Sequence, residues 1–242
     1  MTVKPYKNDT GNKKDQVARM FNNIAPKYDF LNHFLSMGID KLWRKRAIKL
    51  LKSAKPQKVL DVATGTGDLA IALSKKLGTK VTGLDLSSEM LKVAERKIEK
   101  LDNIVIELVQ GDSENLPFSS DVFDAITVAF GVRNFEHLEK GLTEMMRVLK
   151  PGGRMVILEF SKPSAFPMKQ LYNFYFKTIL PFCGGLISKD KAAYTYLPES
   201  VNQFPEGKAF TSILEGIGMV SIKEYRQTFG IATIYFSEKP IQ

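Results

Sequence analysis

Hydrophobic and polar positions alternate with two different periods between residues 58 and 160. Short apolar runs, typical of strands buried on both faces, are followed by longer stretches whose apolar residues lie three and four apart, as in amphipathic helices. In chain order the pattern predicts strand 58–64, helix 67–77, strand 80–86, helix 88–101, strand 104–110, strand 123–130, helix 136–149 and strand 154–160. This alternation favours parallel strands joined by right-handed crossovers, which form a doubly wound α/β sheet.

The alternation stops on both sides of this core. The chain divides into a disordered N-terminus (1–14), an N-terminal helical cap (15–57), the core (58–162), an aromatic-rich insertion (163–205) and a C-terminal unit (206–242). Within the cap we expect helix breaks at Pro26 and Gly38. The C-terminal unit shows a helix at 206–217 and two strands, 220–228 and 231–238, which we expect to pair as an antiparallel hairpin.

Composition is that of one soluble α/β domain. Of the 242 residues 44% are hydrophobic and 25% charged, and no apolar stretch is long enough to span a bilayer. The N-terminal region lacks the apolar core of a secretory signal, and Cys183 has no second cysteine to pair with. Both observations lead us to expect a cytoplasmic protein.

The net charge of +9 is concentrated in one segment. Every charged residue from Lys41 to Lys58 is basic, and apolar residues recur there at helical spacing. A basic amphipathic helix of this kind is a solvated face of a packed helix, a contact for an anionic membrane surface, or a contact for a nucleic acid backbone. Charge alone leaves these three alternatives open.

The first core strand runs into a glycine turn and a helix start, the arrangement of a nucleotide-type binding loop. Gly65 and Gly67 allow the backbone to turn sharply and to approach a ligand closely. With Ala70 they also match the dinucleotide-binding pattern, and Asp85 lies near the position of a ribose-binding acid. Asp61 favours a different ligand, because a carboxylate there repels a pyrophosphate but suits the ammonium and sulfonium groups of S-adenosylmethionine. A turn without any ligand is the remaining alternative.

Acidic residues follow the second and third core strands as well. Asp85 and Leu86 end the second strand, and Asp112 and Ser113 follow the third. Ligands of open α/β sheets bind at the carboxyl ends of the strands. There, Asp85 is suited to accept hydrogen bonds from two ribose hydroxyls, and Asp112 to accept one from an adenine amino group.

Several blocks along nearly the whole chain resemble the menaquinone and ubiquinone biosynthesis C-methyltransferase family. They are FNNIAPKYD at 21–29, LN at 31–32, WR at 43–44, GTGD at 65–68, LPF at 116–118, FGVRN at 130–134, RVLKPGGR at 147–154, EFSKP at 159–163 and YTYLPESV at 194–201. The glycine loop and the KPGG turn occur in many methyltransferases, whereas the blocks at 21–29, 130–134 and 194–201 are more diagnostic. One departure is a shorter connection between the first two strands, which should trim a surface loop only.

The resemblance implies a Rossmann-like class I methyltransferase fold: a mostly parallel seven-stranded sheet with a C-terminal antiparallel hairpin and helices on both faces. It implies S-adenosylmethionine as cofactor, contacted by Thr66, Asp85, Asp112 and Ser113. The implied substrate is a prenylated hydroquinone, most closely demethylmenaquinol, with the insertion covering it. In such a reaction Arg133 would stabilise a phenolate and Tyr28 would complete its hydrogen-bond network, although a structural ion pair and a packed aromatic are the alternative roles.

Other functions compete with this interpretation. The substrate alternatives are another lipid or small phenol, including the ubiquinone-pathway benzoquinol, and the oligomeric state stays open, with a homodimer as one alternative. A nucleic acid is not expected as partner, because the Asn/Asp-Pro-Pro-aromatic block of amino-methylating enzymes is absent after the fourth strand. An NAD-linked dehydrogenase is the third rival. His33 and His137 lack metal-site spacing, so no metal is expected.

The insertion also predicts how a prenylated substrate is reached. Its aromatic and leucine residues make it too apolar for a solvated linker, and the run is too short and interrupted to cross a bilayer. They are Phe166, Leu171, Tyr172, Phe174, Tyr175, Phe176, Leu180 and Phe182. Together with the basic helix they predict reversible, peripheral docking on an anionic membrane.

Overall fold

The computed structural model describes residues 3–179 and 191–241, which form one mixed sheet with helices on both sides. The sheet has seven strands in the order β3-β2-β1-β4-β5-β7-β6. They are β1 (Lys58–Val62), β2 (Lys80–Asp85), β3 (Ile106–Gln110), β4 (Phe123–Ala129), β5 (Leu149–Phe160), β6 (Val220–Gln227) and β7 (Ala232–Glu238). The predicted fold class is confirmed.

Strand pairing follows from the apolar runs of the sequence. β1 lies between β2 and β4 and pairs with both in parallel, whereas β7 pairs antiparallel with β5 and β6. The short 3-10 turn η4 (Thr228–Gly230) joins β6 to β7, so the predicted hairpin is present. β5 is longer than predicted, because Leu149 already pairs with Phe123 before the turn at Gly152.

Alternate residues of each central strand face opposite sides of the sheet and bury different helices. Val59 faces α2 (Ile39–Leu51) and α3 (Asp68–Leu77), whereas Leu60 faces α5 (Leu138–Val148) and α9 (Lys208–Gly216). The helix α4 (Ser88–Ile98) packs beside β2 and β3. This two-sided burial explains why the strands read as continuous apolar runs.

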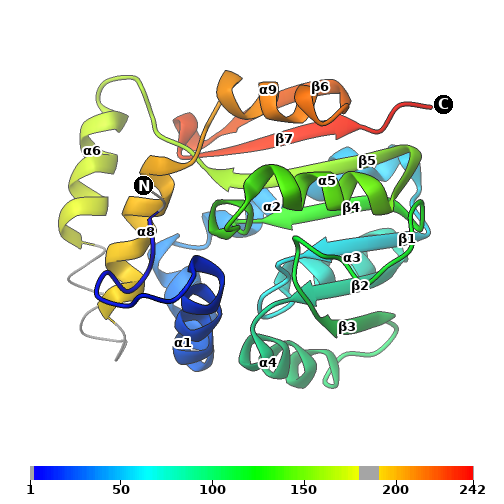
Figure 1. Cartoon of the computed structure of the whole chain (residues 1–242), viewed down its shortest axis with the longest axis horizontal. Helices are drawn as coiled ribbons and strands as arrows, with labels where there is room; N and C mark the ends of the chain where they lie inside the picture. Colours follow the sequence, from blue (N-terminus) through cyan, green and yellow to red (C-terminus); the bar gives the residue numbers. More distant parts are fainter. Residues whose placement is uncertain (1–2, 180–190, 242) are drawn as a thin grey trace.

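The cap and the insertion gather at the edge where the parallel strands end (Figure 1). The elements at this edge are α1 (Lys13–Leu35), α6 (Met168–Phe174), the π-helical turn η3 (Tyr175–Ile179) and α8 (Lys191–Gln203). Figure 1 shows α1, α6 and α8 on the side opposite the C-terminus. Within the described residues, none of the helices is both long and apolar enough to cross a bilayer.

Two expectations for the N-terminal region need correction. Pro26 does not break the helix, because α1 continues through it and is supported by packing against α4. Gly38 does separate α1 from α2, with φ of 74°. Residues 3–12, expected to be disordered, have defined partners: the Val3 N–H donates to Gln203 Oε1 (2.8 Å) and the Tyr6 N–H to Gln16 Oε1 (3.0 Å).

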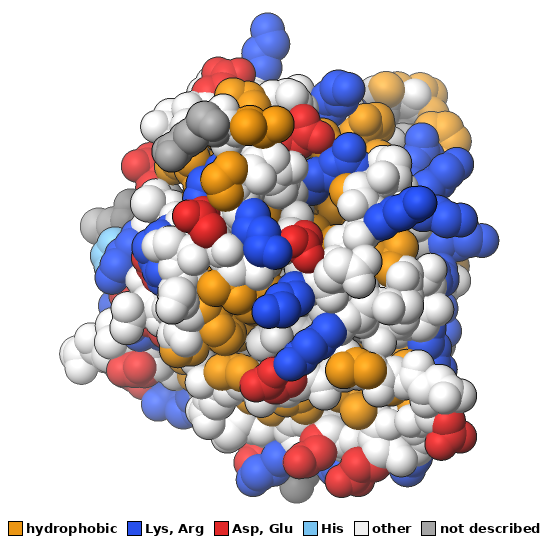
Figure 2. All heavy atoms as spheres, turned by 90° about the vertical axis from the view of Figure 1, so that its right-hand side faces the viewer, with side chains coloured by type: hydrophobic (Ala, Val, Ile, Leu, Met, Phe, Trp, Pro, Cys, Tyr) orange, Lys and Arg blue, Asp and Glu red, His pale blue; other side chains and the backbone are white. Residues whose placement is uncertain are grey.

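The helix α2 has a mostly apolar buried face and a mostly basic exposed face, although Leu42 is exposed and Asp40 is buried. Trp43 and Leu51 are among the residues of its buried face, whereas its exposed residues include Lys41, Lys45, Arg46 and Lys49. Figure 2 shows the face at which the parallel strands begin, where Lys and Arg side chains crowd the right-hand side with few acidic ones among them. The positive charge predicted from the sequence is therefore unevenly distributed over the surface.

Candidate functional site

Two cavities adjoin each other at the carboxyl ends of the strands. The smaller cavity holds about 80 Å³ and the larger cavity about 500 Å³. Phe21 and Tyr28 of α1 and Phe130 and Asn134 after β4 line both of them. These four side chains form a shared wall, across which a group bound in one cavity can face a group bound in the other.

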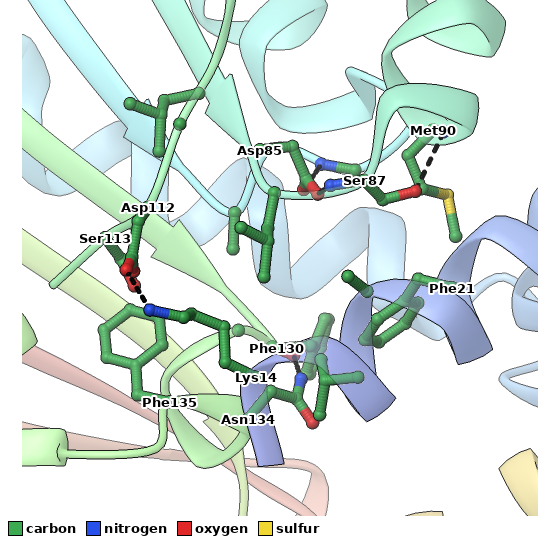
Figure 3. Close-up of a pocket in the computed structure, with 18 of the residues that line it drawn as sticks. Lys14, Phe21, Asp85, Ser87, Met90, Asp112, Ser113, Phe130, Asn134 and Phe135 are labelled. Atoms are coloured by element: carbon green, nitrogen blue, oxygen red, sulfur yellow. Dashed lines mark hydrogen bonds and ion pairs between the residues drawn. The ribbon is translucent and has the colours of Figure 1, made fainter. Parts of the chain in front are cut away.

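The smaller cavity brings together residues predicted from three strand ends (Figure 3). Its lining includes Gly65 after β1, Asp85 and Leu86 after β2, and Asp112 and Ser113 after β3. The carboxylates of Asp85 and Asp112 lie on opposite sides of the space in Figure 3. This spacing offers two separate acceptors to one extended, polar ligand.

Asp85 joins the glycine loop to the start of α4. Its Oδ2 accepts the Gly65 N–H (2.7 Å) and its Oδ1 the Ser87 N–H (2.8 Å). Ser87 in turn caps α4 by accepting the Met90 N–H. Burial raises the pKa of Asp85, against the lowering effect of these backbone donors. The carboxylate is thus held rigidly in place with free lone pairs directed to the cavity.

Asp112 is paired with a residue of α1. Lys14 Nζ lies 2.8 Å from Asp112 Oδ2, and the Glu114 N–H donates to Asp112 Oδ1 (2.9 Å). Burial raises the pKa of Asp112, but these two donors outweigh it and hold the pKa below its ordinary value. Lys14 crosses the cavity to reach Asp112 (Figure 3). With Lys14 in this position the cavity is far smaller than the roughly 300–1,000 Å³ of small-molecule sites.

Asp61 lies at the end of β1, and Thr66 and Gly67 belong to the glycine loop, but none of the three lines the smaller cavity. Asp61 accepts the hydroxyls of Thr127 (2.6 Å) and Thr64 (2.7 Å), and burial raises its pKa to about 6. Thr66 donates to Asp29 of α1. Gly67 begins α3 with φ of 81°, a conformation that favours glycine. Through these contacts and this backbone conformation, the three residues fix the conformation of the loop.

The larger cavity is mostly apolar and aromatic. Met20 and Ile24 of α1, Phe160 at the end of β5, and Leu171 and Phe176 of the insertion are among its lining residues. The insertion therefore covers this cavity, with α6, η3 and α8 on its outer side. Leu180, Phe182 and Cys183, which the sequence also singles out, lie outside the described residues.

Arg133 lines the larger cavity and forms a buried ion pair. It belongs to the 3-10 turn η2 (Val132–Asn134) after β4, and its Nη1 lies 2.7 Å from Oε1 of Glu159 on β5. The Glu159 side chain has 0% exposure, and burial raises its pKa although Arg133 acts in the opposite direction. Arg133 Nε is buried without a partner. The guanidinium is thus anchored on one side and unsatisfied on another.

Tyr28 lies at the shared wall. Burial raises the pKa of its hydroxyl, while the neighbouring Asn32 and Arg133 act to lower it. Glu159, Lys14 and Tyr196 line or support the two cavities and were not predicted from the sequence, and Tyr172 was predicted only as one of the apolar residues of the insertion. Glu159 and Tyr196 stand in the motif blocks at 159–163 and 194–201, which was the available signal.

In the described part of the chain, no group of acidic, histidine or cysteine side chains is arranged to hold a metal ion. The polar lining of the smaller cavity includes Asp85, Asp112 and Ser113 around a glycine turn, and these groups fit the ribose and adenine of a nucleoside. They offer no Lys or Arg cluster for a pyrophosphate apart from Lys14. This composition fits S-adenosylmethionine better than a dinucleotide.

Comparison with known proteins agrees with this geometry. The model of the ubiE/COQ5 methyltransferase family matches residues 9–239. A Demethylmenaquinone methyltransferase of Bacteroides fragilis is 48% identical over 98% of this chain and 97% of its own length. A Ubiquinone/menaquinone biosynthesis C-methyltransferase UbiE of Geotalea daltonii is 46% identical over 94% of this chain and 97% of its own.

Solved structures share the fold at low sequence identity. A SAM-dependent methyltransferase of Thermotoga maritima, described as a possible histamine N-methyltransferase, superposes with a TM-score of 0.65 at 18% identity, covering 92% of this chain and 99% of its own. A SAM-dependent methyltransferase of Aquifex aeolicus has a TM-score of 0.54 at 22% identity, covering 79% and 88%. The predicted methyltransferase class and its S-adenosylmethionine cofactor are confirmed: this chain belongs to the ubiE/COQ5 methyltransferase family.

Proposed function

We propose that this protein transfers a methyl group from S-adenosylmethionine to a ring carbon of a prenylated hydroquinone, demethylmenaquinol. The observation that carries the proposal is the shared wall between a polar, carboxylate-lined cavity and a larger apolar one. Such a pair of sites suits a nucleoside cofactor beside a prenylated aromatic ring. The names of relatives that are 44–48% identical over nearly the whole chain support the same substrate.

In this proposal the smaller cavity seats the cofactor. Asp85 accepts the ribose hydroxyls, Asp112 and Ser113 receive the adenine, and Leu86 packs against it. Gly65 has a φ of 58°, a conformation that favours glycine, and the absence of a Cβ there allows close approach of the ligand. Lys14 leaves Asp112 when adenine binds, since both compete for Oδ2.

Three residues that do not line the smaller cavity still contribute to the proposed cofactor site. Thr66 and Gly67 fix the turn, and Asp61 places a carboxylate beneath it. The ammonium and sulfonium groups of the cofactor favour the ionised form of this buried acid. Asp61 thus acts on the cofactor through electrostatics from behind the backbone.

The chemistry requires an activated acceptor ring. S-adenosylmethionine supplies an electrophilic methyl group, which a neutral quinone ring does not attack. A hydroquinone that loses one phenol proton carries negative charge on the adjacent ring carbon. Arg133 lines the larger cavity and its Nε–H has no partner, so in this proposal the guanidinium stabilises that phenolate and Tyr28 donates beside it. The shared wall holds the ring carbon in line with the methyl group.

Methyl transfer from labelled S-adenosylmethionine tests the proposed function directly. We expect label in a short-chain demethylmenaquinone only after its reduction, with the oxidised quinone as control. A reduced demethylated benzoquinone in a parallel reaction compares the two substrate classes. Absence of transfer to the reduced naphthoquinone would contradict the proposal.

Replacement of Asp85 tests the cofactor site. Asp85→Ala removes the proposed charge-assisted contact with the ribose and should weaken binding of S-adenosylhomocysteine by about 2–4 kcal/mol in calorimetry. The matched control is Asp124→Ala, because Asp124 also accepts two backbone N–H groups, those of Gln57 and Lys58, but at the opposite ends of the strands. Equal affinity of Asp85→Ala and the wild type would reduce Asp85 to a turn residue.

Variants of the ion pair separate catalysis from stability. Arg133→Ala should lower turnover by about 10² or more with near-normal cofactor affinity. It also leaves Glu159 buried and unpaired, which should cost about 3–5 kcal/mol of unfolding free energy. The double variant Arg133→Met/Glu159→Gln removes both charges and should recover stability in urea unfolding without recovering turnover. If its turnover is near that of the wild type, Arg133 is only half of a structural pair.

We further propose that the protein docks reversibly on an anionic membrane through the mouth of the larger cavity. Met37, Leu171 and Phe174 line that cavity and yet are 81%, 58% and 59% exposed. Exposed apolar side chains at a cavity rim are typical of a contact with another apolar surface. The basic face of α2 begins beside them at Lys41. A prenyl tail can then pass from the bilayer into the cavity.

Sedimentation with vesicles tests the docking proposal. The wild type should sediment with anionic vesicles at low salt, and less as salt is added, because each Lys or Arg near the surface contributes about 1 kcal/mol at most. Lys41→Glu/Lys45→Glu should weaken sedimentation. Lys140→Glu/Lys208→Glu, with the same change in net charge on the opposite face of the sheet, should not. A wild type that methylates a short-chain quinol but does not sediment would refute docking.

A further inference from the structure

Buried polar atoms without hydrogen-bond partners are concentrated around the larger cavity. Buried polar groups in proteins are nearly always hydrogen-bonded, so each exception calls for an explanation. Among the described residues the exceptions are His33 Nδ1, Arg133 Nε, Asn134 Oδ1 and the hydroxyls of Tyr172 and Tyr196. All of them except His33 belong to residues that line the larger cavity. This pattern indicates a polar ligand that the cavity receives.

The two tyrosines are held firmly by their rings while their hydroxyls stay free. Tyr172 of α6 is 8% exposed and stacks on Phe176, with ring centroids 4.1 Å apart. Tyr196 of α8 is 3% exposed and packs in the same apolar cluster as Met20 and Ile24 of α1. Since each ring is fixed by packing, its hydroxyl cannot turn to water to find a partner.

The unpaired groups form two sets on different elements. Arg133 and Asn134 belong to η2, and Asn134 lines both cavities, so this set lies beside the shared wall. Tyr172 and Tyr196 belong to the insertion and line the larger cavity only. A ring with oxygens at opposite positions carries one hydrogen-bonding group for each set.

The two sets also differ in charge. Arg133 is a cation, whereas burial raises the pKa of both tyrosine hydroxyls far above neutrality, so that they remain neutral donors. A phenolate oxygen is therefore favoured beside Arg133, and a neutral oxygen beside the tyrosines. The carbon next to the phenolate then lies toward the shared wall.

We propose that the hydroxyls of Tyr172 and Tyr196 bind the second ring oxygen of the hydroquinone, opposite the one that loses its proton. This inference rests on the proposed function and adds to it two positioning residues that select a 1,4-dihydroxy ring. They orient the ring between the insertion and η2, so that the methyl-accepting carbon faces the cofactor. A phenol with one hydroxyl leaves both tyrosines unpaired and is disfavoured.

Paired substrates and variants test this assignment. We compare kcat/KM, at saturating S-adenosylmethionine, for a short-chain demethylmenaquinol and for the matched 3-alkyl-1-naphthol, which lacks only the second hydroxyl. Tyr172→Phe and Tyr196→Phe should each lower kcat/KM for the quinol roughly 10-fold and change that for the naphthol little. The ratio of kcat/KM for the quinol to kcat/KM for the naphthol should therefore be lower in each variant than in the wild type. The intrinsic difference in reactivity between the two rings is the same for every enzyme and cancels in this comparison.

Tyr235→Phe is the matched control. Tyr235 is equally buried, but its hydroxyl accepts the Gly207 N–H (2.9 Å). Its replacement should lower the unfolding free energy and leave the substrate preference unchanged. Tyr172→Phe and Tyr196→Phe should keep or raise the unfolding free energy, because each removes an unpaired buried hydroxyl.

Equal losses for the two substrates, or none, would overturn the assignment. Failure of the wild type to methylate the quinol would instead overturn the proposed function, and this inference with it. Both variants bind the cofactor in a cavity that the tyrosines do not line, so unchanged affinity for S-adenosylhomocysteine confirms that each variant is folded.

Discussion

The buried ion pair between Arg133 and Glu159 constrains the whole carboxyl edge of the sheet. A carboxylate with no solvent contact is stable only when its charge and lone pairs are matched. Glu159 meets this requirement with Arg133 Nη1 and with the N–H groups of Phe160 and Arg133. Lys13 of α1 in turn donates to the carbonyls of Arg133 and Phe135. The position of η2, and with it the guanidinium, is therefore fixed by β5 on one side and by α1 on the other.

α1 converts the open edge of a common fold into two adjoining sites. Its side chains Phe21 and Tyr28 separate the cavities, and Lys14 closes the smaller one. Asn22 Oδ1 fastens the helix to the start of α4 by accepting the Ser87 hydroxyl (2.7 Å). The sheet supplies the acids at its strand ends, and the added helix supplies their cover. Under the proposed function, the cap and the insertion therefore contact the acceptor, whereas the core contacts the cofactor.

The sequence predicts best what depends on local pattern. The strands are recognisable because each is a short apolar run, and Asp85, Asp112 and Ser113 could be grouped because the ends of parallel strands share one edge. Pro26 gave a wrong prediction. Proline usually ends a helix, but α1 continues through Pro26 because tertiary packing supports it. The unpaired hydroxyls of Tyr172 and Tyr196 could not be predicted from the sequence, since a missing hydrogen-bond partner is a property of the folded cavity.

The helix α1 bounds both cavities, so neither can change shape independently. Lys14 of this helix pairs with Asp112 at the smaller cavity, and the same helix carries Met20, Ile24 and Tyr28 in the larger cavity. Any ligand that favours one position of α1 changes the affinity of the neighbouring cavity. Thermodynamic linkage makes this effect reciprocal, so the factor by which the cofactor alters quinol binding equals the factor by which the quinol alters cofactor binding. Under the proposed function, the shared helix is the element that couples the two binding equilibria.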